Sequence, residues 1–121
     1  ALKKYAPVVC LLEVNGVGLG LFDRFKAQCS KCREWTTTNE SKQEIVSDLI
    51  MSFDDKNIAI PTRQLMPEMS DELADFGFEF SPKTRKIVYK ALTGHDDIVI
   101  SLGLADHARR SYRNYGQYKI I

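Results

Sequence analysis

Two groups of acidic residues have the types and positions that metal chemistry requires. Glu13 is the one charged residue in the apolar run 8–14 (VVCLLEV), and Gly94-His95-Asp96-Asp97 comes directly before another apolar segment. Burying a carboxylate in an apolar strand is costly unless a cation or hydrogen-bond donors meet it. Two adjacent carboxylates at a helix start repel each other unless helix-end amides, a cation or a metal offset their charge. Both groups therefore need partners.

A divalent metal ion is one partner that would satisfy both groups. Mg²⁺ and Mn²⁺ are commonly bound by carboxylates from separate elements, with positions left open for water and phosphate. Glu13 with Asp97 and Asp96 supplies such a donor set, and His95 beside them could orient a water or contact phosphate. Two simpler interpretations remain open: Glu13 pairs with a basic residue at a sheet edge, and the 94–97 segment is only a helix cap.

The elements that would position these residues alternate between strands and helices. Run 8–14 is strand-like, ends at Asn15-Gly16 and predicts a strand buried on both faces, with Glu13 near its carboxyl end, where open α/β sheets place their sites. The pattern as a whole predicts one compact α/β unit. The other expected elements are a helix to about residue 28, strand 34–38, a helix with Ile45, Val46, Leu49, Ile50 and Phe53 on its apolar face, strand 58–60, a helix containing Met69, Leu73 and Phe76, a hairpin of 78–80 with 87–89, and a last helix near 97.

Length and charge restrict the alternatives. A chain of 121 residues, 44% of them hydrophobic, suits one small domain. All 16 acidic residues come before His107, whereas the last fifteen positions are basic and rich in tyrosine. Such a tail could lie along a phosphate backbone or an acidic protein surface, or be a solvated arm. No apolar run is long enough for a membrane span or resembles a signal peptide, which predicts a cytosolic, reduced protein.

Other chemical motifs are incomplete. Cys29 and Cys32 form a C-x-x-C, but no second pair completes a tetrahedral zinc site, and Cys10 lies inside an apolar run. Glycines 16, 18 and 20 do not have the spacing of a dinucleotide or phosphate loop, and no serine or cysteine has the signature of a nucleophile. The acidic groups remain the strongest signal.

Two segments of the sequence resemble a known family. Residues 8–18 (VVCLLEVNGVG) resemble the strand of phage large-terminase nucleases that ends in Glu-x-Asn-x-x-Gly. Residues 93–105 (TGHDDIVISLGLA) resemble the His-Asp-Asp segment of the same family, which is followed by an apolar helix with small residues. Between them Ser41-Lys42, strand 58–60 and the Glu72-Leu73-x-x-Phe76 stretch follow the family's order, so the resemblance spans residues 5–108.

The resemblance implies a fold and a site. The fold is an α/β, ribonuclease H-like mixed sheet flanked by helices and incomplete at its N-terminal side, with a partial terminase nuclease domain over 1–108 and a basic, tyrosine-rich tail over 109–121. Glu13 matches the family's second acidic position, Asp97 its third and Asp96 an auxiliary ligand of a two-metal Mg²⁺ or Mn²⁺ site. His95 would be an auxiliary or phosphate contact. The expected DNA contacts are Arg109, Arg110, Arg113 and Lys119.

The resemblance also implies an activity and partners. The expected reaction is metal-dependent endonucleolytic cleavage of concatemeric double-stranded viral DNA during genome packaging, with the portal and the small terminase subunit as partners. It would occur in the host cell cytoplasm, transiently at the procapsid portal and without a membrane. The family's first aspartate lies on an earlier strand, so this stretch alone is expected to be weak or inactive, and its open sheet edge could pair with a second copy.

Two alternative functions use the same features. Another ribonuclease H-like nuclease, such as a resolvase or transposase core, would place similar carboxylates on a similar sheet. A non-catalytic DNA- or protein-binding module would instead use the basic tail and keep the carboxylates for structure alone.

Overall fold

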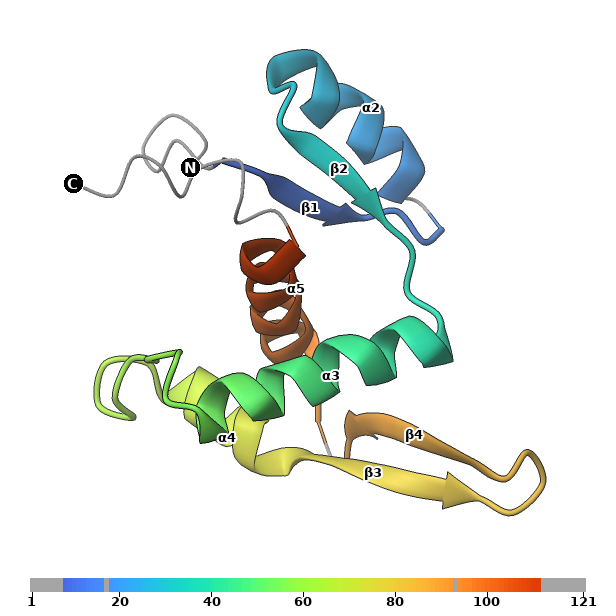
Figure 1. Cartoon of the computed structure of the whole chain (residues 1–121), viewed down its shortest axis with the longest axis vertical. Helices are drawn as coiled ribbons and strands as arrows, with labels where there is room; N and C mark the ends of the chain where they lie inside the picture. The colour runs from blue at the N-terminus through green and yellow to red at the C-terminus, as the bar shows by residue number, and fades with distance from the viewer. Residues whose placement is uncertain (1–7, 17, 93, 112–121) are drawn as a thin grey trace. The chain divides into compact units, whose positions relative to one another are not determined.

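The structure, a computed structural model, describes residues 8–16, 18–92 and 94–111 and is mixed α/β (Figure 1). It divides into two compact units, residues 1–38 with 107–121, and residues 39–106. None of the described helices is both long and apolar enough to cross a membrane. In chain order the elements are β1 (Cys10–Glu13), α2 (Gly18–Gln28), β2 (Cys32–Trp35), α3 (Asn39–Asp54), α4 (Pro67–Asp75), β3 (Phe76–Ser81), β4 (Lys86–Ala91) and α5 (Asp97–Ser111).

The first unit is built on a pair of parallel strands. β1 and β2 pair with Cys10 opposite Cys32 and Glu13 opposite Trp35, and α2 forms the crossover that parallel strands require. The helix packs against both strands (Figure 1). Its Phe22 side chain is buried. Beyond the strands, the Asn15 side chain continues the pairing, because it accepts from the Thr37 amide and donates to the Thr37 carbonyl, each at 2.8 Å.

Two details of the first unit differ from the sequence-based expectation. The prediction that strand 8–14 is buried on both faces is wrong, because β1 is half-buried and Glu13 is exposed. In the described part of the chain β1 pairs with β2 alone, so no second strand covers its other edge. The strand expected at 34–38 is found at Cys32–Trp35, and Thr36 to Thr38 leave the ladder before α3.

The second unit has its core between α3 and α5. The predicted apolar face of α3 is confirmed at Ile45, Val46 and Leu49, which are buried, whereas Ile50 lies half-exposed at its border. Ile45 faces Gly103 of α5, and a Cβ at position 103 would lie 3.4 Å from the Ile45 Cδ1 atom, which is ordinary van der Waals contact. The buried face of α3 therefore contacts α5 at this position.

A buried polar pair joins the same two helices. The Ser52 hydroxyl lies 2.9 and 2.8 Å from the Oδ1 and Oδ2 atoms of Asp106, and both residues are at most 3% exposed. A buried carboxylate needs donors, because the lost hydration is otherwise not replaced. Ser52 is one such donor, and it fixes the position of α5 on α3.

The predicted hairpin is confirmed, with strands longer than expected. β3 and β4 pair antiparallel with Phe78 opposite Tyr89 and Ser81 opposite Lys86. Arg85 occupies the left-handed region at φ 55°, which closes the turn. The predicted strand 58–60 is wrong, because these residues form no strand. The segment has only three residues before Pro61, and a proline cannot donate a hydrogen bond to a ladder. The helix expected around Met69 and Leu73 is confirmed as α4, with Pro67 in its first turn, but Phe76 begins β3 and does not belong to the helix.

Replacement of Ser52 tests the buried pair. Ser52→Ala removes a donor from the Asp106 carboxylate, so we expect the free energy of unfolding to fall by about 1–3 kcal/mol. Chemical denaturation followed by circular dichroism measures the change. Ser47→Ala, at an exposed position of the same helix, is the control and should change stability by less than about 0.5 kcal/mol. Equal effects at both positions would contradict a structural role for the pair.

Candidate metal centre

His95 and Asp96 lie between β4 and α5, Asp97 is the first residue of α5, and residues of α4 hold this segment in place. The amide of Gly94 donates to the Asp75 Oδ2 atom at 3.0 Å, and the amide of Val99 donates to the Glu72 Oε1 atom at 2.8 Å. Glu72 and Asp75 are three residues apart, so they lie on the same face of α4. Glu72 thus satisfies an amide of the first turn of α5, which no partner within the helix could reach.

Asp96 and Asp97 have different surroundings. Asp96 lies just before α5, and its Oδ2 atom is 2.8 Å from the Lys42 Nζ atom of α3, with both side chains more than two-thirds buried. Asp97 is the first residue of α5 and is exposed; among the described residues no hydrogen bond or ion pair engages its carboxylate. The unpaired Asp97 is therefore the better placed of the two to bind a cation from solution.

The charge around the start of α5 is predominantly negative. Glu72, Asp75, Asp96 and Asp97 contribute carboxylates, and Lys42 contributes the ammonium group that contacts Asp96. The N-terminal end of a helix offsets a part of such charge. Carboxylate oxygens are the ligands that Mg²⁺ and Mn²⁺ prefer, so this donor set fits a hard divalent ion.

Glu13 belongs to the first unit, whereas His95, Asp96 and Asp97 belong to the second. The Glu13 side chain is exposed at the carboxyl end of β1. It lies two residues before Asn15, whose side chain is hydrogen-bonded to the backbone of Thr37. The structure thus brings the members of the 95–97 segment together with α3 and α4. A joint site with Glu13 stays a prediction.

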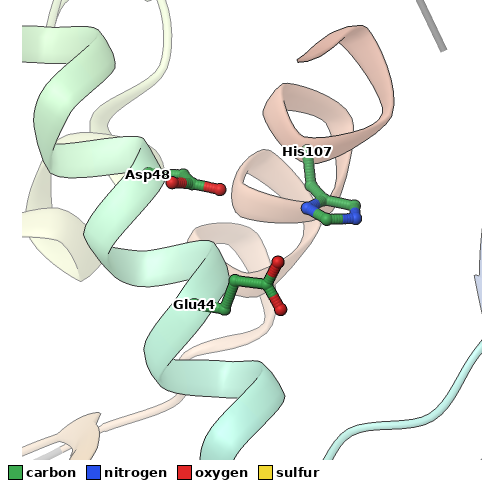
Figure 2. Close-up of side chains that lie close together, drawn as sticks. All are labelled: Glu44, Asp48 and His107. Carbon is green, nitrogen blue, oxygen red and sulfur yellow. The ribbon is translucent and has the colours of Figure 1, made fainter. Parts of the chain in front are cut away.

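Sequence reasoning missed a pair of acidic residues on α3. Glu44 and Asp48 are one helical turn apart, their carboxylates lie on the same side of the helix (Figure 2), and a ligand oxygen of one lies within 4.8 Å of one from the other. Their spacing of four on a predicted helix was the available signal. His107, also drawn in Figure 2, belongs to the first unit, where its ring packs edge-on against Trp35 at 4.7 Å between centroids.

Lys42, Glu72 and Asp75 were also not assigned to the site from the sequence. Each acts through a partner far along the chain, so no local pattern distinguishes it from an ordinary surface charge.

The basic residues expected to contact DNA lie only in part within the described chain. Arg109 and Arg110 are in the last turn of α5, where Arg109 is exposed and Arg110 half-buried. Basic side chains at this end of a helix also complement its dipole. Arg113 and Lys119 lie outside the described residues. The role of all four in DNA binding stays a prediction, as do the domain limits at 108 and 109.

Replacement of Glu72 tests its hydrogen bond to the start of α5. Glu72→Ala leaves the Val99 amide without this acceptor, so we expect a loss of about 0.5–2 kcal/mol in unfolding free energy, as for loss of a helix cap. Glu72→Gln keeps an oxygen that can accept the same bond and should retain most of the stability. Urea denaturation of the two variants measures the difference. A glutamine variant as unstable as the alanine variant would count against the bond.

Comparison of the chain with known proteins found a similar solved structure. No family model matches the chain, and no curated protein matches it. Its structure matches the crystal structure of the large terminase nuclease from thermophilic phage G20c with bound magnesium, with a TM-score of 0.65 and 28% sequence identity, over 76% of this chain and 48% of that one. The chain thus spans about half the length of the nuclease it matches. The predicted resemblance is confirmed: in fold and in sequence the chain is similar to the nuclease of a phage large terminase.

Proposed function

We propose that the chain is part of the metal-dependent, ribonuclease H-like endonuclease of a phage large terminase. The observation that carries this proposal is its match, over 76% of its length, to a terminase nuclease that was crystallised with magnesium. The start of α5, with its surplus of carboxylates, supports the same assignment. Phosphodiester hydrolysis is a reaction that such oxygen-ligand metal sites perform.

The proposed ligands are Asp97, Glu13 and Asp96, in that order of importance. Asp97 is exposed with no described partner, and Glu13 is an exposed carboxylate at a strand end. Asp96 is ranked last because one of its oxygens is held by Lys42. A bound Mg²⁺ or Mn²⁺ ion, or two of them as in the family, would lower the pKa of a bound water and offset charge that develops on the phosphate.

The neighbouring residues have positioning roles in this proposal. Glu72 and Asp75 fix the backbone on either side of residues 95–97, and Lys42 orients Asp96 while reducing its repulsion of Asp97. Asn15 and Thr37 hold the chain just after Glu13. His95 is exposed beside the carboxylates and would contact a phosphate oxygen of the DNA.

The wider role proposed is cleavage of concatemeric double-stranded viral DNA during packaging. Arg109 with the basic tail would contact the DNA backbone, which predicts binding that weakens as salt rises. The proposed partners are the portal, the small terminase subunit and further copies of the chain paired through an open sheet edge. The proposed place of action is the host cytoplasm, at the procapsid portal.

Metal binding by charge-neutral variants tests the site. We expect Asp97→Asn and Glu13→Gln each to weaken Mn²⁺ binding at least tenfold in isothermal titration calorimetry, because each removes a negatively charged ligand. Asp55→Asn and Glu34→Gln are matched controls, since Asp55 is exposed in a turn and Glu34 is exposed on the strand beside Glu13. Neither should change the affinity. Any cleavage of plasmid DNA in Mn²⁺ should also be lost in Asp97→Asn.

The double variant tells a shared ion from two separate ones. If Glu13 and Asp97 bind the same ion, the combined loss of binding free energy should differ from the sum of the two single losses. Unchanged Mn²⁺ affinity in both single variants would remove the basis of the nuclease assignment. Salt-dependent DNA binding retained in that case would favour a non-catalytic binding module.

A comparison at Asp96 tests the order of the ligands. Asp96→Asn should weaken Mn²⁺ binding less than Asp97→Asn does, because the Asp96 carboxylate is already paired with Lys42. Lys42→Met should strengthen Mn²⁺ binding several-fold, since it removes a positive charge and frees an oxygen ligand. Calorimetry on both variants measures these effects. Weaker binding in Lys42→Met would mean that the ion pair is required to build the site.

A further inference from the structure

The three cysteines of the chain gather at one end of the first unit, although Cys10 is far from the other two in the sequence. Cys10 is the first residue of β1 and Cys32 the first residue of β2, and the two are register partners in the parallel pair. Cys29 follows the last residue of α2 and precedes Cys32 by three positions. All three are free cysteines.

Backbone geometry places Cys32 within disulfide reach of both other cysteines. Neighbouring strands lie about 4.8 Å apart, and register partners such as Cys10 and Cys32 direct their side chains to the same face. A disulfide needs Cα atoms roughly 4.4–6.8 Å apart. On the other side, the Cys32 amide donates to the Cys29 carbonyl at 3.3 Å, which closes a turn between these residues.

Cys32 is the most deeply buried of the three thiols. It is 1% exposed, and both Cys29 and Cys10 are close enough to affect its thiol. Burial, with the two neighbouring thiols, raises the pKa of the Cys32 thiol, so it is the least reactive of the three toward a reagent in solution. Cys10 and Cys29 are half-buried and more accessible.

A metal site explains this arrangement less well. Structural zinc takes four tetrahedral ligands. Among the described residues, the one group with three or more potential ligand atoms in mutual proximity contains no cysteine. Cys32 instead has two possible partners, Cys10 and Cys29. This arrangement suits a single disulfide of Cys32 that can exchange between them.

We propose that Cys10, Cys29 and Cys32 form a redox-sensitive site in which Cys32 makes one disulfide, with either Cys29 or Cys10. The oxidant is a low-molecular-weight disulfide. The thiolate of Cys29 or Cys10 attacks it, forms a mixed disulfide and releases one thiolate. The thiolate of Cys32 then attacks the protein-bound sulfur and releases the second, so two protein thiols are oxidised and one disulfide is reduced to two thiols.

Treatment of the native, full chain with oxidised glutathione tests the proposal, with the product identified by alkylation, digestion and mass spectrometry. The wild type should form one intramolecular disulfide and keep one free thiol. Cys10→Ser should yield only the Cys29–Cys32 bond, and Cys29→Ser only the Cys10–Cys32 bond. Both replacements are at half-buried positions, so we expect each variant to fold. A circular dichroism spectrum like that of the wild type checks this.

Cys32→Ser should form no intramolecular bond, with glutathione added singly to the remaining thiols. A bond between Cys10 and Cys29, in any variant, would overturn the central role of Cys32. Three thiols that stay reduced, or that carry only glutathione in the folded wild type, would overturn the proposal as a whole.

Discussion

The side-chain contact between α3 and α5 is the constraint on which the second unit depends. Ile45 of α3 packs over Gly103 of α5, where a Cβ would lie in ordinary van der Waals contact with the Ile45 side chain, at 3.4 Å from its Cδ1 atom. The buried Ser52–Asp106 pair further restricts how α5 can lie on α3, because hydrogen bonds tolerate less displacement than apolar packing does. Shape and polarity together therefore define one position of α5 on α3.

Two of the proposed ligands depend on that contact, because Asp96 and Asp97 are at the start of α5. Once α5 is fixed, Asp96 reaches Lys42 of α3, and the first turn of α5 reaches Glu72 of α4. Asp97 is positioned without a side-chain contact of its own, because hydrogen bonds to Asp75 and Glu72 hold the backbone on both sides of it. A carboxylate that is oriented by its backbone and left open at its oxygens is suited to receive a metal ion.

Much of the fold could be predicted from local patterns, and the departures have physical reasons. The hairpin of β3 and β4 was predictable because its alternating residues and its turn are adjacent in the sequence. Residues 58–60 had strand-like composition, but Pro61 follows them directly and cannot donate to a ladder, and they pair with no described strand. Glu13 was identified as a site residue from an assumed burial, yet it is exposed because β1 has one described neighbour. Lys42 was not predictable, since its partner is 54 residues away.

The central proposal, that Glu13 and Asp97 are both ligands in a divalent-metal site, can be tested most directly by paramagnetic broadening from Mn²⁺ in ¹H–¹⁵N spectra of the chain. At a low ratio of Mn²⁺ to protein, the account predicts that amide signals around Glu13 and around Asp97 broaden together, and that Mg²⁺ restores both. Broadening confined to one of these segments, or centred on Glu44 and Asp48 of α3, would contradict it.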